Sequence, residues 1–522
     1  MVTAWPVLAF WAAALVLYLA GLGIEPLRDW DEGTYAQVAR EMRQTGLAGW
    51  LHPTLWSQPY FDKPPFGTGL IALMFGLFGE GEIAARLPGA VLTATSVPLF
   101  YMLARDVCDR EDQARWSAAI YLTLLPVLRH GRLAMLDGMM VFFCIAMLLC
   151  FLRVWRCGQR PALWAFAAGL CVAMMALTKG LLAVPLLGIG VGFLVLMRSP
   201  AISTVKFWAA LALGASPAFG WLVLQWAHYG GVFTQRGLVD QGVMRLLESV
   251  EGNRGTPIYY LLEIAKLCWP WLLFLPAGLA LAWQQRQRPW ARLGLLWLLG
   301  FTLLVSIMPT KLPWYIYPAF PGLALICGGA VAESLSRMKA PGQTQARILW
   351  AGLWVLPMLV VVSGAGVAYF SPVGGDPVPV LFVATILLAV TFAVSFVLWR
   401  RLDPRGASVL VAGLYVGLLM FSVSGRSVWE LGEGYPVIPV ASVIRLVVPP
   451  DAAIYTTDTA SRPSLNFYSG RRVEPRPAAE FRDRTQFGNS YWLTTPEAVA
   501  EAAIDIVVLG TVGARLIVRR GN

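Results

Sequence analysis

Charged residues are scarce in this chain. Lys, Arg, Asp and Glu together make up 14% of its 522 residues, whereas hydrophobic residues make up 57%. A water-soluble protein of this length could not bury so much apolar surface, so its solvent must be lipid. The alternating pattern of a transmembrane β-barrel is also missing, and the helix is the other structure that can span hydrocarbon. The sequence therefore predicts an all-α polytopic membrane protein.

The sequence also lacks the features that mark several other classes of protein. Five of its seven cysteines fall in apolar runs and none follows Cys327, so neither a disulfide framework nor a cysteine-based zinc site is indicated. No P-loop, internal repeat or low-complexity segment occurs. Residues 5–23 have no basic leader and no small-residue cleavage site, so we expect an uncleaved first span.

The net charge of +11 follows a topological pattern. Lys and Arg collect in every second loop, beginning with 105–115 and 153–160, which obeys the positive-inside rule if the N-terminus is cytoplasmic. Membrane topology therefore explains the charge, and we expect no nucleic-acid partner. Apolar length and loop charge together predict thirteen spans at about 5–23, 84–104, 116–130, 136–153, 162–178, 181–197, 207–227, 257–282, 291–308, 314–333, 348–370, 378–399 and 408–425.

The spans divide the chain into two predicted domains. Residues 1–425 form a transmembrane domain whose first outer loop covers about 24–83, and residues 426–522 form a small outer α/β domain. In that loop, the apolar stretch 66–78 is too short to cross a bilayer, so we expect a juxtamembrane or re-entrant helix. In the C-terminal domain, VIRLVVPPDAAIYTTDT, SLNFYSGRRV and IDIVVLG have the composition of short strands, and a helical pattern follows near 496–503.

An acidic stretch, RDWDEGTYAQVAREM at residues 28–42, follows the first apolar run. Apolar residues at i, i+3, i+4 and i+7 from Tyr35 predict a short amphipathic helix on the membrane surface. Helix capping explains two of the acids, because Asp29 suits the N-cap and Glu32 then has capping-box spacing. Capping leaves Asp31 without a role.

Basic residues also gather in outer segments, which the positive-inside rule should leave poor in them. In YFDKPP and KLPWYIYP a lysine lies beside prolines, which favour extended or turn backbone. Snorkelling, or an exposed ion pair between Asp62 and Lys63, explains one such residue but not the set. Cations at an outer interface suit the phosphate of a lipid whose tail stays in the bilayer. The predicted ligands of this phosphate are Lys63, Arg28, Lys311, Lys179 and Arg132.

The order of the motifs resembles that of the GT-C glycosyltransferases, which take a sugar from a polyprenyl phosphate. The motifs are WDEGTYAQVAREM, YFDKPP, GEIAARLPGA, LAMLDG, LTKG and KLPWYIYP, and the resemblance covers essentially the whole chain. Within that class the sequence is most similar to the ArnT-like family, the aminoarabinose transferases that modify lipid A. The resemblance implies the GT-C fold, with juxtamembrane helices and a periplasmic C-terminal α/β domain. The motifs are specific for the class and weak evidence for the sugar.

The resemblance also implies roles for single residues. Asp31, paired with Glu32 in the catalytic stretch, falls on the position of the catalytic base. Lys63 and Lys311 fall on lysines of the family's motifs, with Lys63 implied in donor-phosphate contact. A divalent metal ion is implied as a cofactor, and its predicted ligands are Asp62, Asp137 and Asp240.

Four positions depart from the family pattern. Thr34 stands where the family commonly has an arginine, so Arg28 could substitute for it. Asp62 stands where a glutamate is usual, and Asp240 and Gln241 stand where a Glu-His pair is usual. A histidine ligand is therefore missing, and the sequence leaves the metal site open.

The implied reaction needs no nucleotide. An acceptor hydroxyl loses its proton to Asp31 as it attacks the anomeric carbon, and fixed cations stabilise the departing polyprenyl phosphate. One in-line attack inverts the configuration. The implied partners are a polyprenyl-phosphate-linked sugar and a lipid or glycolipid acceptor such as lipid A, at the periplasmic face of the bacterial inner membrane. The C-terminal domain is expected to cap the active site.

Two alternatives stay open. A protein O-mannosyltransferase, or another envelope-glycan transferase, would use the same donor chemistry. A lipid transporter or flippase would favour inverted repeats and charges near the bilayer midplane, and the sequence shows neither.

Overall fold

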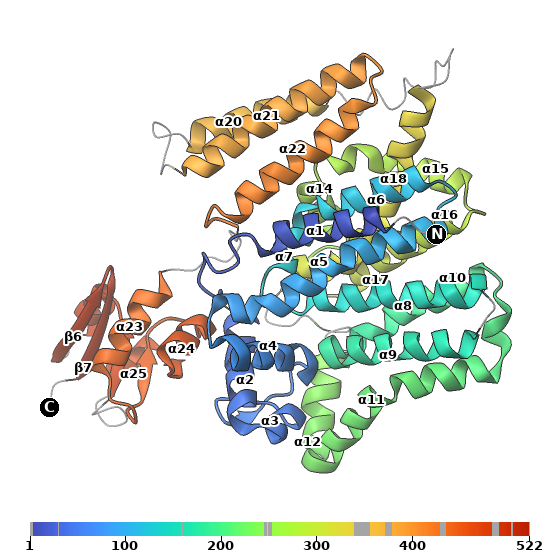
Figure 1. Cartoon of the computed structure of the whole chain (residues 1–522). Coiled ribbons are helices and arrows are strands. Elements are labelled where there is room, and N and C mark those ends of the chain that lie inside the picture. The colour runs from blue at the N-terminus through green and yellow to red at the C-terminus, as the bar shows by residue number, and fades with distance from the viewer. Residues whose placement is uncertain are drawn as a thin grey trace. The chain divides into compact units, whose positions relative to one another are not determined.

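The chain forms two compact units (Figure 1). Unit 1 consists of Met1–Ile24, Phe61–Gly67 and Arg86–Ser427, and unit 2 of Glu25–Tyr60, Thr68–Ala85 and Val428–Asn522. The contacts thus group most of the first outer loop with the C-terminal segment, whereas the sequence assigned that loop to the transmembrane domain. The computed structural model describes residues 4–29, 31–157, 160–244, 248, 253–338, 355–370, 378–427, 435–482, 490–502 and 505–520.

Unit 1 is helical. Proline stands in the first turn of many of its helices, where the missing N–H costs no hydrogen bond. The segments η1, η2, η4 and η6 are 3₁₀-helices, and η3 and η5 are π-helices. The helices that lie wholly or mostly in unit 1 are α1 (Trp5–Leu19), α5 (Glu82–Val107), α6 (Glu111–Leu122), α7 (Leu125–Gly131), α8 (Asp137–Cys157), α9 (Pro161–Lys179), η1 (Gly180–Leu182), α10 (Ala183–Leu196), η2 (Pro200–Ser203), α11 (Val205–Tyr229), α12 (Gly231–Phe233), η3 (Thr234–Met244), α14 (Tyr259–Leu267), η4 (Trp271–Phe274), α15 (Leu275–Gln284), α16 (Pro289–Leu295), η5 (Leu296–Gly300), α17 (Phe301–Ile307), η6 (Pro313–Ala319), α18 (Phe320–Met338), α20 (Val355–Phe370), α21 (Pro379–Arg400) and α22 (Arg405–Ser422).

The described part of the chain contains eight helical segments long and apolar enough to cross a membrane, or nine if the bent pair Tyr259–Leu267 and Trp271–Gln284 is one span. This confirms a multi-span helical membrane protein. Several predicted spans are broken: 116–130 is divided between α6 and α7, and 257–282 bends by 115°. Part of the predicted span 348–370 lies outside the described residues. The count of thirteen stays a prediction.

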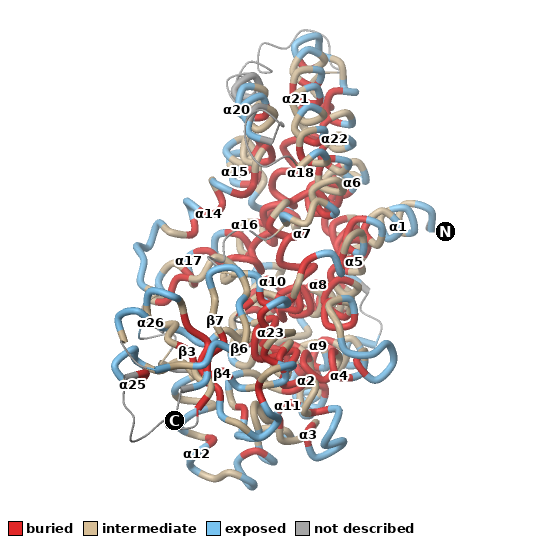
Figure 2. Tube along the Cα trace, turned by 90° about the vertical axis from the view of Figure 1, so that its left-hand side faces the viewer, coloured by how far each residue is buried: buried red, intermediate tan, exposed pale blue. Residues whose placement is uncertain are grey.

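Close helix contacts in unit 1 depend on glycine. The helices α8, α9 and α11 lie side by side (Figure 1). A Cβ atom on Gly169 of α9 would lie 2.1 Å from the carbonyl oxygen of Leu211, and one on Gly214 of α11 would lie 2.1 Å from that of Phe166. Small residues at helix interfaces are the usual way to bring backbones together in lipid. Figure 2 shows buried residues along α8 and α18, whereas α11 leaves most of its surface exposed, as a lipid-facing helix would.

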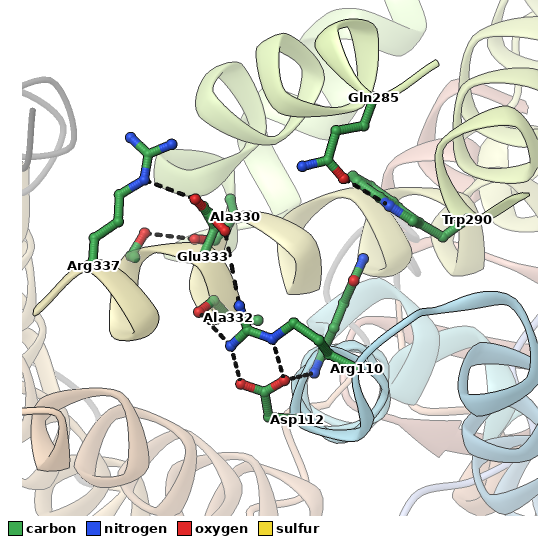
Figure 3. A network of polar contacts seen from close by, with 10 residues as sticks. Arg110, Asp112, Gln285, Trp290, Ala330, Ala332, Glu333 and Arg337 are labelled. Atoms are coloured by element: carbon green, nitrogen blue, oxygen red, sulfur yellow. Dashed lines mark hydrogen bonds and ion pairs between the residues drawn. The ribbon is translucent and has the colours of Figure 1, made fainter. Parts of the chain in front are cut away.

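Ion pairs tie together loops at one end of unit 1 (Figure 3). Arg110, just before α6, lies 3.8 Å from Glu333 of α18, and Glu333 accepts a 2.8 Å hydrogen bond from Arg337. Arg288 reaches Asp109 at 2.6 Å. These residues come from three different loops of the basic set. Three of the loops that the charge pattern placed on one side of the membrane therefore lie together.

Unit 2 combines helices of the first outer loop with a five-stranded sheet. The strand order is β4-β3-β5-β7-β6; β3 is parallel to β4 and β5, and β7 is antiparallel to β5 and β6. The sheet packs on α23 through a core that includes Ile444, Leu493 and Ile517. The elements that lie wholly or mostly in unit 2 are α2 (Asp31–Thr45), α3 (Leu47–Leu51), β1 (Thr54–Leu55), β2 (Gln58–Pro59), α4 (Pro65–Phe78), α23 (Val437–Val447), β3 (Ile454–Thr456), α24 (Pro463–Ser469), β4 (Val473–Pro475), α25 (Ala478–Arg482), β5 (Tyr491–Thr494), α26 (Pro496–Ala502), β6 (Ile506–Val512) and β7 (Arg515–Arg520).

Unit 2 confirms some local predictions and overturns others. The helices predicted near 66–78 and 496–503 form as α4 and α26, and the small C-terminal α/β fold is present. The stretches VIRLV and SLNFYS, however, are helical rather than extended, because α23 buries its apolar face on the sheet and proline opens α24. The apolar face of α2 is buried by protein, with Tyr35 1% exposed. The prediction that this face lies on the membrane surface was wrong.

Candidate active site

The candidate site residues divide between the two units. Unit 2 contains Arg28, Asp31 and Glu32, and unit 1 contains Asp62, Lys63, Arg132, Asp137, Lys179, Asp240 and Lys311.

The first turn of α2 presents Asp31. The helix begins at this residue, and the backbone N–H of Arg28 donates to Oε2 of Glu32 at 2.9 Å. The N–H of Gly33 donates to the carbonyl of Arg28 at 3.1 Å, and the Arg28 guanidinium pairs with Glu25 at 2.6 Å. Glu32 is 2% exposed, whereas Asp31 is partly exposed. Asp31 is therefore the more exposed carboxylate of this pair, and it lies at the N-terminus of α2.

Asp29 is bonded by residues of the C-terminal segment. Its Oδ2 accepts a 2.6 Å hydrogen bond from Nε of Arg462, and its Oδ1 accepts bonds from the backbone N–H, at 3.1 Å, and the hydroxyl of Ser464. Ser464 stands in the first turn of α24, so Asp29 satisfies a backbone N–H at the start of that distant helix. Its role as the N-cap of α2 stays a prediction.

The YFDKPP stretch contacts the end of α11 and the π-helix η3. The ring of Phe61 packs 5.0 Å from that of Tyr229, and Oδ1 of Asp62 accepts a 2.8 Å hydrogen bond from Nε2 of Gln241. The ammonium of Lys63, a partly exposed residue, donates to the carbonyl of Asp62 at 3.0 Å. Asp240 points to another partner, Gln235, at 2.9 Å.

Asp137 and Lys179 form a buried ion pair. Asp137 is the first residue of α8 and Lys179 the last of α9, and Nζ to Oδ1 measures 2.6 Å. The two side chains are 1% and 8% exposed. The helix dipole favours both charges, because the negative Asp137 lies at a helix N-terminus and the positive Lys179 at a helix C-terminus. The structure thus pairs a predicted metal ligand with a predicted phosphate ligand.

Two further predicted phosphate ligands, Lys311 and Arg132, donate to carbonyls at helix C-termini. The three ammonium protons of Lys311 are matched by three carbonyls at the end of α17, those of Val305 at 3.0 Å, Ser306 at 2.8 Å and Met308. Burial lowers the pKa of this ammonium. Arg132 donates to the carbonyls of Ala20, beyond α1, and Ser422, at the end of α22.

Helix chemistry therefore explains most of the outer cations. Lys311 and Arg132 donate to carbonyls at helix ends, Lys179 pairs with Asp137 and Arg28 pairs with Glu25. Phosphate binding by these four stays a prediction that competes with a structural role. Lys63 is partly exposed and donates to the carbonyl of its neighbour Asp62, and its phosphate contact also stays a prediction.

Comparison with known proteins gives one signal. A family profile described as dolichyl-phosphate-mannose-protein mannosyltransferase matches residues 62–223. Two undecaprenyl phosphate-α-4-amino-4-deoxy-L-arabinose arabinosyl transferases of Pseudomonas fluorescens are each 30% identical, over 63% and 68% of this chain. The matches span 61% and 66% of those relatives' own lengths. The crystal structure of ArnT from Cupriavidus metallidurans bound to undecaprenyl phosphate matches 99% of this chain and 98% of its own with a TM-score of 0.77, at 20% identity.

The chain has the fold of ArnT and is similar in sequence to these arabinosyl transferases. The same ArnT in the apo state matches with a TM-score of 0.76 at 22% identity. The archaeal oligosaccharyltransferase AglB of Archaeoglobus fulgidus matches less well, with a TM-score of 0.57.

The ArnT-like resemblance implies a divalent metal, and the predicted ligands do not fit one. Among the described residues, no group of three or more His, Cys, Asp or Glu side chains is placed to hold an ion. Asp62 meets the amide of Gln241, Asp240 meets Gln235 and Asp137 meets a lysine. An amide N–H and an ammonium donate protons and cannot ligate a cation. We therefore derive no catalytic step through a metal ion.

Sequence reasoning missed Arg462 and Ser464. Both contact Asp29 in the acidic stretch, yet they lie in the C-terminal segment, 433 and 435 positions away. No local spacing links positions so far apart, and the segment that contains Ser464 has the composition of a strand. The sequence contains one indication that Gln241 belongs to the candidate site, because it follows Asp240 at a position where the family usually has a histidine.

Proposed function

We propose that this protein is an inverting glycosyltransferase of the bacterial inner membrane. It transfers 4-amino-4-deoxy-L-arabinose from undecaprenyl phosphate to lipid A or a related envelope glycolipid. The observation that carries the proposal is the 30% identity to relatives whose names state this donor. The near full-length match to an ArnT structure that holds undecaprenyl phosphate supports the same donor lipid.

The chemistry is assigned from this chain's own residues. Asp31, partly exposed at the start of α2, takes the proton of the acceptor O–H as its oxygen attacks the anomeric carbon. The bond to the donor phosphate breaks, and the phosphate leaves with the electron pair. Lys63 stays a predicted ligand of the donor phosphate, where a cation would stabilise the charge that develops.

The active site and the C-terminal segment are proposed to face the periplasm. The basic loops joined by the Arg110, Glu333 and Arg337 contacts would then be cytoplasmic, as the positive-inside rule requires.

Transfer in a purified system tests the proposal. Folded protein in lipid nanodiscs would be given undecaprenyl-phosphate-linked aminoarabinose and lipid A, and the lipid A would be weighed by mass spectrometry. We expect the mass of one aminoarabinose to be added by the native chain and not by the Asp31→Asn variant. No transfer by the folded native chain would refute the proposal.

A second candidate function, protein mannosylation, can be tested in the same way, because the matching family profile describes a protein mannosyltransferase. Polyprenyl-phosphate mannose and an unfolded protein acceptor would replace the two lipids. Mannose transfer without aminoarabinose transfer would favour that candidate.

A further inference from the structure

The short helix α24 of the C-terminal segment contacts the acidic stretch on both sides of Asp31. On the N-terminal side, the backbone N–H of Leu27 donates to the hydroxyl of Tyr468 at 2.7 Å. That hydroxyl donates in turn to Glu82 at 2.6 Å. On the C-terminal side, a Cβ atom on Gly33 would lie 2.5 Å from the backbone of Pro463, so a larger residue cannot fit.

The strongest of these contacts is at Asp29, two residues before the candidate base. Its carboxylate is 8% exposed and accepts three hydrogen bonds, one from Arg462 and two from Ser464. The Arg462 side chain is 10% exposed, and it also donates to the carbonyl of Tyr435 at 2.8 Å. The guanidinium stacks 4.2 Å from the centre of the Tyr435 ring. A buried, multiply bonded and stacked arginine has little freedom to move, so it fixes Asp29 in place.

We propose that Arg462 and Ser464 are positioning residues for Asp31. The start of α24 holds Asp29 on one side and packs against Gly33 on the other, and so it fixes the first turn of α2 from which Asp31 projects. The C-terminal segment is then part of the catalytic machinery and more than the cap that the sequence suggested. This inference rests on the proposed function, because it assumes that Asp31 acts as the base.

The chain offers a matched control. Arg515 is a second partly buried arginine of the C-terminal segment; it pairs with Asp458 at 2.5 Å and stacks 4.4 Å from the same Tyr435 ring. No contact joins it to Asp29 or Gly33 in the described structure. Arg462→Gln and Arg515→Gln therefore remove comparable ion pairs, and only the first loosens the acidic stretch.

The experiment measures kcat, KM and thermal unfolding for the full-length chain in nanodiscs, with the aminoarabinose donor and lipid A. A displacement of about 1 Å costs about a hundredfold in rate, so we expect Arg462→Gln to lower kcat between about tenfold and a hundredfold with KM for the donor unchanged. Ser464→Ala, which keeps the backbone bond, should lower kcat less. Arg462→Lys should restore part of the loss. Arg515→Gln should keep native kcat.

A combined variant separates positioning from loss of fold. In the Asp31→Asn background the base is already absent, so Arg462→Gln should lower kcat no further. Equal losses of kcat for Arg462→Gln and Arg515→Gln, in step with their thermal stability, would overturn the inference. Additive losses in the combined variant would do so too. Native turnover for Asp31→Asn alone would instead refute the proposed base, and no transfer by the native chain would refute the proposed function.

Discussion

Replacing Lys179 with methionine should destabilise the protein through its partner Asp137. The substitution keeps an unbranched side chain, one atom shorter, and leaves a carboxylate that is 1% exposed without its counter-charge. Removing one partner of a buried ion pair costs about 3–5 kcal/mol. Asp137 keeps the favourable N-terminus of α8, worth about 0.3–1 kcal/mol, but among the described residues its Oδ2 has no hydrogen-bond partner. We therefore expect a loss of about 3 kcal/mol.

The assay is reversible unfolding in detergent micelles, followed for Lys179→Met, Asp137→Asn and the double variant. The double variant removes both charges, so its stability should return to within about 1–2 kcal/mol of the native chain. Unchanged stability in Lys179→Met would refute the reasoning from burial. Donor binding by the double variant then tests whether Lys179 also binds the donor phosphate. A native affinity for the donor would mean that Lys179 serves only in the ion pair with Asp137. A lost affinity would support the predicted phosphate contact.

Four further outcomes are expected. Asp31→Asn should fold and bind donor lipid but lose at least about a hundredfold in kcat, since a general base contributes about 10²–10⁴; a mild effect would refute Asp31 as the base. Lys311→Met should lower the unfolding free energy by about 2 kcal/mol or more, because the end of α17 loses charged hydrogen bonds; lost donor binding in a stably folded variant would restore its predicted phosphate role. Dialysis against EDTA should leave turnover unchanged, because Asp62 accepts a hydrogen bond from an amide N–H and does not join other metal-ligating side chains. A loss of activity that Zn²⁺ or Mn²⁺ restores would contradict this. A reporter fused after residue 522 should be active only in the periplasm; cytoplasmic activity would reverse the topology.

The sequence predicts those features that depend on neighbouring residues. The helix from Asp31, the short apolar helix Pro65–Phe78 and the common end of the basic loops follow from periodicity, apolar length and charge. Each of these signals is contained in a window of a few tens of residues. The same local signals fail where burial on a distant element decides, as in Pro463–Ser469, which forms a helix from residues typical of a strand.

In the candidate site, too, the sequence reveals single residues but not their distant partners. Asp31 was selected as the acid of its stretch that helix capping does not explain, and its role as the base stays a prediction. The cations were predicted as a set because their charges are visible in the sequence. Their partners are backbone carbonyls, which every residue carries, and so nothing in the sequence distinguishes the helix end that Lys311 satisfies. The partner of Asp29 was invisible for the opposite reason, since it is a specific side chain at an arbitrary distance.

The distance between Asp29 and Arg462 has a consequence for biosynthesis. The two residues are 433 positions apart, so at about 5–20 residues per second a ribosome needs roughly 20 to 90 s to make the second after the first. During that time the acidic stretch is already synthesised and lacks the helix that contacts it. The nascent chain therefore completes the contacts around Asp29 late in its folding. A translation product that stops before Arg462 would lack these contacts.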